Sequence, residues 1–159
     1  TPGRDSDYAF RSSLSSTLAF GLFGNGDGPQ SGPPASDFPF TRAKAVLAQC
    51  RELQRYFLGD YYPLTSYSKA RNVWLAWQFH LPDTNEGMVQ AFRREQSPFE
   101  SARFPLRGLE PDAQYRITDV DSSEGPQTFT GQELMTRGLP VRMRQSPGAI
   151  VLIYRHEAR

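Results

Sequence analysis

The stretch Val73-Trp-Leu-Ala-Trp-Gln-Phe-His80 decides the fold class of this 159-residue chain. Its side chains alternate with a period of two, the period that places successive residues on opposite faces of a β-strand. One face carries Val73, Leu75, Trp77 and Phe79, and the other carries Trp74, Gln78 and His80. The pattern predicts a half-buried strand with the first face in a core, the second face turned away from it, and the two tryptophans on opposite sides.

The same kind of signal recurs downstream, up to the last residues. Three segments alternate in this way, and two more are apolar on both sides, as is typical of central strands covered on both faces. The alternating segments are residues 101–107, 114–120 and 139–144, and the apolar ones are residues 88–92 and 149–154. Thr130-Gly-Gln-Glu133 is a capping box that opens a short helix or turn, which Gly138 closes. These elements predict a mainly β fold, an antiparallel β-sandwich of a jelly-roll-like kind.

Upstream of the strands, residues 41–58 have the pattern of one amphipathic α-helix. Apolar residues recur there at helical spacing: Ala43, Val46, Leu47, Cys50, Leu53 and Phe57. Thr41 is placed to cap the first turn and Gly59 to end the last. The opposite side is polar, so we expect the helix to lie on a surface with one face in a core.

The segment before this helix contains one compact apolar run, Leu18-Ala-Phe-Gly-Leu22, and then a glycine-rich turn. The run predicts one buried strand, and the Pro-, Gly- and Ser-rich residues 28–39 predict an extended connector. We therefore divide the chain into residues 1–40, the helix at 41–58 and a β domain at 59–159.

Composition and charge argue against several classes of function. The chain carries 18 basic and 17 acidic residues, with no continuous basic patch, so neither nucleic acid nor a membrane surface is an expected partner. Cys50 is the single cysteine and falls on the apolar side of the predicted helix, where we expect a buried, inert thiol. No residues have the spacing of metal ligands, and we predict no metal and no cofactor. The first residues show no signal-peptide organisation, and the compartment stays open.

Five segments in a fixed order carry a family resemblance. They are Gly59-Asp60-Tyr61-Tyr62-Pro63-Leu64, Glu86-Gly-Met-Val-Gln-Ala-Phe-Arg-Arg94, Ser101-Ala-Arg-Phe-Pro-Leu-Arg-Gly-Leu109, Thr130-Gly-Gln-Glu-Leu-Met135 and Ile150-Val-Leu-Ile-Tyr-Arg155. With the helix before them, they resemble the C-terminal end of the retaining α-galactosidases of glycoside hydrolase family thirty-six and their clan relatives, over about two thirds of the chain.

The resemblance implies that Leu18 to Leu22 is the last strand of a (β/α)₈ barrel and that the predicted helix closes that barrel. Residues 1–40 are then a barrel-end remnant with its connector, and the rest is the antiparallel β domain appended to the catalytic barrel of the same polypeptide. The family's nucleophile and acid/base are carboxylates on earlier barrel strands, so no catalytic residue is carried over. The implied function is a non-catalytic domain that stabilises the barrel of an α-galactosidase-like enzyme.

A few residues are candidates for binding. On the barrel interpretation, Asn25 and Asp27 lie at the active-site end and contact a galactoside or another glycan. Trp74 either packs against the helix or barrel or offers a stacking platform to a sugar ring. Tyr61 and Tyr62, at the helix exit, are expected to anchor the domain junction. The first alternative function is a carbohydrate-binding module built around Trp74, and the second is a structural module that forms homo-oligomers through an exposed apolar face.

Other polar groups have plainer interpretations. Asp119, Asp121 and Glu124 lie in a turn with Ser and Gly residues, where acidic side chains are usually solvated. His80 and His156 have no partners at ligand spacing, and we interpret them as surface or strand-end histidines.

Overall fold

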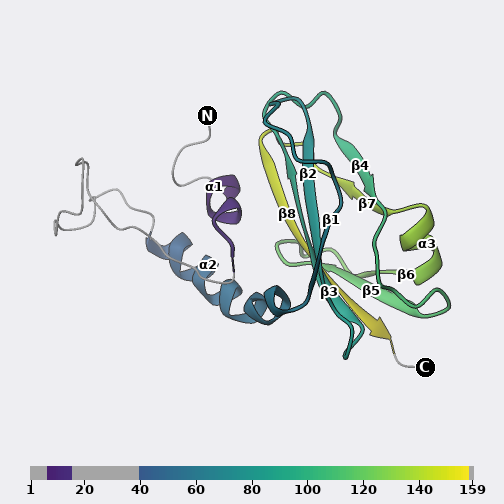
Figure 1. Cartoon of the computed structure of the whole chain (residues 1–159). Coiled ribbons are helices and arrows are strands. Elements are labelled where there is room, and N and C mark those ends of the chain that lie inside the picture. The colour runs from purple at the N-terminus through teal and green to yellow at the C-terminus, as the bar shows by residue number, and fades with distance from the viewer. Residues whose placement is uncertain (1–6, 16–39, 158–159) are drawn as a thin grey trace.

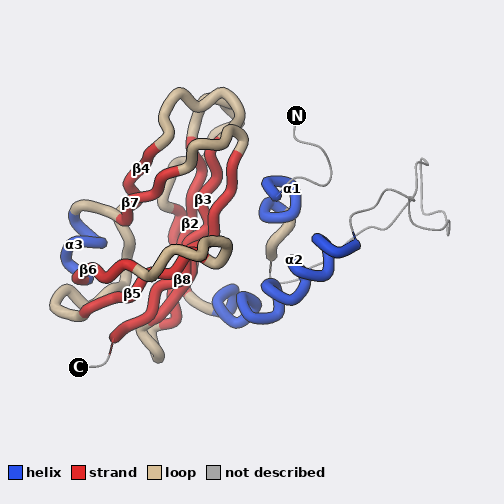
Figure 2. Tube along the Cα trace, turned by 180° about the vertical axis from the view of Figure 1, so that it is seen from behind, coloured by secondary structure: helices blue, strands red, loops and turns tan. Residues whose placement is uncertain are grey.

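The computed structural model describes residues 7–15 and 40–157, which form two antiparallel sheets and a set of helices. The elements are α1 (Asp7–Ser12), α2 (Phe40–Leu53), the 3₁₀-helix η1 (Gln54–Leu58), β1 (Asp60–Pro63), β2 (Trp74–Leu81), β3 (Glu86–Arg93), β4 (Ser101–Phe104), β5 (Gln114–Asp119), β6 (Gln127–Thr130), α3 (Gly131–Thr136), β7 (Leu139–Arg142) and β8 (Gly148–Glu157). The large sheet has the strand order β1-β2-β3-β8-β5-β6, and β4 pairs with β7 in a small sheet. The small sheet and α3 lie on one side of the large sheet, and α1 and α2 lie on the other (Figures 1 and 2). The predicted fold class, an antiparallel β domain preceded by a helix, is confirmed.

Two predicted elements fall on residues that are not described. The strand at residues 18–22 and the connector at residues 28–39 both lie outside the described ranges. The short helix α1 was not predicted. Within the described ranges, no helix combines the length and the apolar character needed to cross a membrane.

The central strands β3 and β8 serve two separate cores. Every residue of β3 is buried. Met88 and Val151 belong to the core that the helices cover, whereas Val89 and Leu152 belong to the core between the two sheets. This alternation follows from the geometry of a strand, which points successive side chains to opposite faces. The prediction of central strands covered on both faces is therefore confirmed.

The capping box at the start of α3 is also confirmed. Thr130 Oγ1 accepts a hydrogen bond from the Glu133 N–H at 3.1 Å, and Glu133 Oε2 accepts one from the Thr130 N–H at 3.0 Å. Gly138 follows the helix with a φ of +81° and donates its N–H to the Glu133 carbonyl, so it ends the helix as predicted. Leu134 is fully buried, which fixes α3 against the small sheet.

The buried face of the long helical segment differs from the prediction at its first half. Among the side chains described in this segment, Cys50, Leu53 and Tyr56 are buried, and Leu47, predicted to be buried, is 39% exposed. The first turns of α2 extend away from the sheet (Figure 1), and Leu47 belongs to neither of the two cores that the described residues form. Tyr56 is buried because the segment continues as η1, where side chains three residues apart share a face.

The two ends of this helical segment are set in different ways. α2 begins at Phe40, so Thr41 lies inside the first turn and the prediction that it caps the helix is wrong. Gly59 ends η1 as predicted, with its N–H donating to the Tyr56 carbonyl at 3.0 Å. A side chain at Gly59 would collide with the carbonyl of His80, so the close approach of β2 requires glycine there.

Both faces of β2 are covered, and the more polar face, predicted to point away from the core, is the more deeply buried one. Ala76, Gln78 and His80 are buried at 1%, 0% and 2% exposure, whereas Trp77 and Phe79 are half-buried on the side of the helices. The prediction that Gln78 and His80 point away from the core is wrong. His80 is the last but one residue of β2, which agrees with a strand-end histidine, but it is buried and does not lie at the surface. β2 lies inside the large sheet and is covered on both sides, and buried polar side chains are tolerated where they are hydrogen-bonded.

A buried network takes up the polar atoms of Gln78 and His80. Gln78 Nε2 donates to the Tyr154 hydroxyl at 2.7 Å and to the Arg107 carbonyl at 2.8 Å, and Gln78 Oε1 accepts from the Arg107 N–H at 2.9 Å. His80 Nδ1 lies 2.9 Å from the same hydroxyl. Gly87 provides the space for that hydroxyl, because a Cβ at this position would collide with it. The network attaches the loop at Arg107 to the centre of the large sheet.

This network makes the stability of the fold depend on pH through His80. Burial lowers the pKa of His80, with a smaller opposing effect from Asp60. Since the unfolded histidine has a pKa of about 6.5, protonation favours the unfolded chain, and stability is full above about pH 6.5 and falls as the pH drops below it. We expect the free energy of unfolding in urea to fall between pH 7 and pH 5, by up to about 1.4 kcal/mol per pH unit from this residue. The variant His80→Gln should lose this part of the decline.

His156→Gln is the matched control, because His156 is exposed at the end of β8. This variant should keep the wild-type dependence on pH. Equal pH dependence in His80→Gln and the wild type would contradict a buried, neutral His80.

Candidate functional site

One face of the large sheet joins the β domain to the helices that precede it. The apolar contact is formed by side chains from both sides, which we call the helix-facing core: Leu14, Cys50, Leu53, Tyr56, Met88 and Val151. Aromatic rings extend this core at its edges, with Phe57 and Phe79 at 4.9 Å and Tyr8 and Phe92 at 5.7 Å between ring centroids. Cys50 is buried as predicted, and burial raises the pKa of its thiol. Apolar burial of this kind is the main favourable term that holds two layers together.

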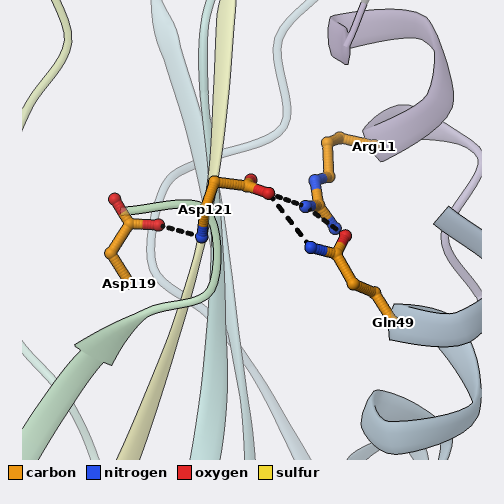
Figure 3. A network of polar contacts seen from close by, with 4 residues as sticks. All are labelled: Arg11, Gln49, Asp119 and Asp121. Atoms are coloured by element: carbon orange, nitrogen blue, oxygen red, sulfur yellow. Dashed lines mark hydrogen bonds and ion pairs between the residues drawn. The ribbon is translucent and has the colours of Figure 1, made fainter. Parts of the chain in front are cut away.

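A polar clamp lies at one end of the helix-facing core (Figure 3). Arg11 from α1 is only 1% exposed, and its Nη2 donates to Asp121 Oδ1 and to Gln49 Oε1, each at 2.5 Å. Gln49 from α2 donates to the same Asp121 oxygen at 3.1 Å. The loop after β5 holds this carboxylate in place, because the Asp121 N–H donates to Asp119 Oδ1 at 2.9 Å. Arg11, Gln49 and Asp121 thus connect both helices to the sheet, and we call them the Arg11 clamp.

The Arg11 clamp corrects the interpretation of the acidic turn. Asp121 forms an ion pair with a buried cation, so the prediction of a merely solvated side chain is wrong for this residue. A buried guanidinium without a counter-ion is strongly destabilising, which makes Asp121 necessary where Arg11 is buried. Arg11 Nε and Nη1 are buried and have no acceptor among the described residues. The described residues therefore satisfy the guanidinium only in part.

A second clamp lies at the other end, between η1 and the hairpin of β2 and β3. Glu86 is 7% exposed and accepts hydrogen bonds from Arg55 Nη2 at 2.5 Å and from the Tyr56 hydroxyl at 3.2 Å. Arg155 on β8 approaches the same carboxylate at 3.5 Å. The Arg55 guanidinium also lies over the Tyr56 ring, 4.7 Å from its centroid. Glu86, Tyr56 and Arg55, the Glu86 clamp, fix the position of η1 on the sheet.

Tyr61, a predicted junction residue, lies beside the helix-facing core, and Tyr62 points elsewhere. A half-open hollow of about 280 Å³ is lined by Leu14, Ser15, Phe57, Tyr61, Trp77, Phe79 and Gln90. Tyr61 is 56% exposed at its edge and stacks at a tilt on Phe79, 5.4 Å away. The Tyr62 hydroxyl donates to Asp60 Oδ2 at 3.4 Å. That the two tyrosines anchor a domain junction stays a prediction.

The predicted sugar contacts are placed only in part. Trp74 is half-buried, with its indole N–H donating to the Phe99 carbonyl at 3.0 Å and its ring centroid 6.0 Å from that of Phe104. It packs against the core between the sheets, on the side away from the helices. Asn25 and Asp27 lie outside the described residues. Their roles, and that of Trp74 as a stacking platform, stay predictions.

No group of three or more histidine, cysteine or acidic side chains that could hold a metal ion occurs in the described part of the chain. His156 is exposed, as predicted, with its ring centroid 6.0 Å from that of Tyr115. The polar groups at the helix-facing core form hydrogen bonds and ion pairs with each other, so this surface is built for attachment between elements.

Comparison with known families identifies the β domain. The family model of the glycosyl hydrolase family 36 C-terminal domain matches residues 74–154, which include β2 to β8 up to Tyr154. The chain belongs to this family. The resemblance inferred from the five sequence segments is therefore confirmed, and no curated protein sequence matched the chain.

Solved structures of family 36 enzymes share the fold. The galactosidase domain of the α-galactosidase-sucrose kinase AgaSK is similar with a TM-score of 0.61 at 19% identity, over 77% of this chain and 17% of that one. The α-galactosidase AgaB from Geobacillus stearothermophilus matches with a TM-score of 0.61 at 21% identity, over 79% of this chain and 17% of its own. A variant of AgaA from the same bacterium, in complex with 1-deoxygalactonojirimycin, has the same TM-score and identity, over 77% of this chain and 17% of that one. The chain thus spans 17% of the length of each of these proteins.

The clamp residues were not singled out as site residues from the sequence. Tyr56 had a usable signal, because it continues the three-residue spacing of Cys50 and Leu53. Arg11 and Asp121 are 110 positions apart, and nothing in either local sequence marks the pair.

The Glu86 clamp predicts a measurable coupling in the family 36 domain. Because a hydrogen bond to a charged acceptor is strong when buried, Glu86→Gln and Tyr56→Phe should each destabilise the chain and should be coupled by about 1 kcal/mol. The measurement is a double-mutant cycle of the free energy of unfolding in urea. Glu100→Gln is the control, since its ion pair with Arg142 spans 3.7 Å between exposed groups, and it should cost less than about 0.5 kcal/mol. Strict additivity of the two clamp variants would contradict the contact.

Proposed function

We propose that the chain is the non-catalytic C-terminal β domain of an α-galactosidase-like retaining glycoside hydrolase, in which it stabilises the catalytic barrel. One observation carries this proposal: the helix-facing core, closed at both ends by the Arg11 and Glu86 clamps, attaches the β domain to the helices before it. On this proposal, α2 and η1 are the closing helix of the barrel, and the helix-facing core is the joint between barrel and β domain.

The state of the carboxylates at this joint supports a non-catalytic role. A retaining glycosidase needs two carboxyl groups about 5 Å apart, one of them free to attack the sugar. Glu86 accepts from Tyr56 and Arg55, and Asp121 is paired with Arg11. Carboxylates that are held by cations in this way have a structural role, so the reaction is assigned to a barrel elsewhere in the polypeptide.

The lengths of the solved relatives support a partner in the same polypeptide. This chain spans 17% of each of the three solved proteins described above, so most of each of those proteins lies outside the matched domain. A galactoside is then the substrate of the barrel rather than of this domain.

The test compares activity with resistance to heat in the polypeptide that carries this chain behind its barrel. Asp121→Asn, which weakens the Arg11 clamp, should shorten the half-life of 4-nitrophenyl-α-galactoside hydrolysis at elevated temperature several-fold. It should leave kcat/KM at 25 °C within about twofold of the wild type, because the clamp touches no substrate. Glu100→Gln, which removes an exposed charge, should change neither quantity.

Two outcomes would overturn the proposal. Hydrolysis of 4-nitrophenyl-α-galactoside by the 159-residue chain alone would show that it carries its own catalytic groups. A fall in kcat/KM of Asp121→Asn with an unchanged half-life would give the clamp a part in the reaction instead of in stability.

A further inference from the structure

A groove opens between the two sheets, on the face of the large sheet opposite the helices. Strands β4 and β7 form one wall and β5, β6 and β8 the other, where the small sheet stands over the large one (Figure 1). Its volume of about 600 Å³ lies within the range of roughly 300 to 1,000 Å³ that is typical of small-ligand sites. The groove is separate from the helix-facing core and is not explained by the attachment of the barrel.

The floor of the groove is apolar. Ile117 and Leu152 are buried at 6% and 7% exposure, and Ile150 and Phe129 beside them are half-buried. The core between the sheets thus reaches the surface here, without a covering element among the described residues. The C–H faces of a ring-shaped ligand can displace water from such a floor.

A carboxylate with an unoccupied hydrogen-bond acceptor lies at the edge of this floor. Asp119 ends β5 and is half-buried, and its Oδ1 accepts one hydrogen bond, from the Asp121 N–H. Its Oδ2 has no partner within the described part of the chain. Burial raises the pKa of Asp119, which indicates a carboxylate that is poorly hydrated and gains from a hydroxyl donor.

The rim of the opposite wall carries donors. Arg103 and Arg142 line the groove only from its rim, because they alternate along β4 and β7 with the core-facing Ala102 and Val141 and are exposed. Arg103 donates through Nη1 to the Gly138 carbonyl at 3.3 Å, and Arg142 makes only a loose ion pair with Glu100, so both guanidinium groups keep unused N–H groups. Among the described residues, neither arginine pairs with Asp119 or with Glu124, the other acid that lines the groove. Two cations and two anions give the groove no preference for a charged ligand, and they offer both donors and acceptors to a neutral one.

We propose that this groove is a non-catalytic binding site for a neutral oligosaccharide. The apolar floor contacts the ring faces, Asp119 accepts hydrogen bonds from sugar hydroxyls, and Arg103 and Arg142 donate from the rim to the outer hydroxyl oxygens. The proposal rests on the proposed function only for the choice of sugar, an α-galactoside. It uses the opposite face of the sheet, so its failure would leave barrel stabilisation intact.

The experiment is a chemical-shift titration of the ¹⁵N-labelled 159-residue chain with melibiose, a neutral α-galactoside. We expect saturable shifts at the groove residues, centred on Asp119, with millimolar affinity. Asp119→Asn keeps an acceptor for the Asp121 N–H and removes the charge, and it should weaken binding roughly tenfold, as expected for a lost charged hydrogen bond. Asp112→Asn, the same change at an exposed residue outside the groove, should bind like the wild type.

A second variant, which blocks the groove sterically, tests the site independently in case Asp119→Asn changes the fold. Gly125 lines the groove, and a Cβ there meets no atom within 4 Å, so Gly125→Trp has room for its first side-chain atom and places a large ring at the groove, where it should strongly weaken binding. Four results would each overturn the proposal. The first is the absence of groove shifts at about 10 mM melibiose, ten times a dissociation constant of about 1 mM. The second is binding that survives both groove variants, and the third is a set of shifts centred on Trp74. The fourth is tighter binding of galacturonic acid or galactosamine than of melibiose.

Discussion

The arrangement depends on one constraint, that the central strands β3 and β8 are apolar on both faces. A strand pair of this kind is stable in water only when both faces are covered. One cover is the small sheet with α3, and the other is the helical segment before β1 (Figure 1). Met88 and Val151 need the second cover as much as Val89 and Leu152 need the first. The helices therefore complete a layer of the domain, and this gives the joint to a barrel its physical basis.

Apolar burial alone would not fix where the helices lie, because it has no direction. The two clamps supply the direction. Arg11 and Glu86 are both buried, and each has its opposite charge on the other layer. A shift of a helix by one turn would leave a buried charge without its partner, which costs several kcal/mol. The helix-facing core supplies most of the stabilisation, and the clamps select one register. On the other face of the sheet, the neutral hydrogen-bond network around Tyr154 fixes the position of the loop at Arg107 in the same way.

Three features were predictable, because each depends on residues that are close together in the sequence. They are the fold class, the capping box at Thr130 and the two strands that are apolar on both faces. The faces of β2 were not predictable. Alternation indicated the more apolar side as the core, but both sides are covered, and Gln78 and His80 are buried through partners far along the chain. The candidate site depends still more on distant pairs, since Arg11 meets Asp121 only when the sheet has formed. The groove could not be predicted for the same reason. The sequence indicates the order of the strands along the chain, but it does not indicate which strands lie next to each other in the folded domain.

The need for a helical cover on the large sheet is tested most directly by the urea-unfolding curve of residues 59–159, followed by tryptophan fluorescence and compared with that of the whole chain. The truncated domain lacks the helical cover and both clamps, and it exposes Met88, Phe79 and Val151. We expect its cooperative transition to be lost or to move to much lower urea concentrations. A cooperative transition at the midpoint of the whole chain would contradict this expectation, because the sheet would then need no cover on that face.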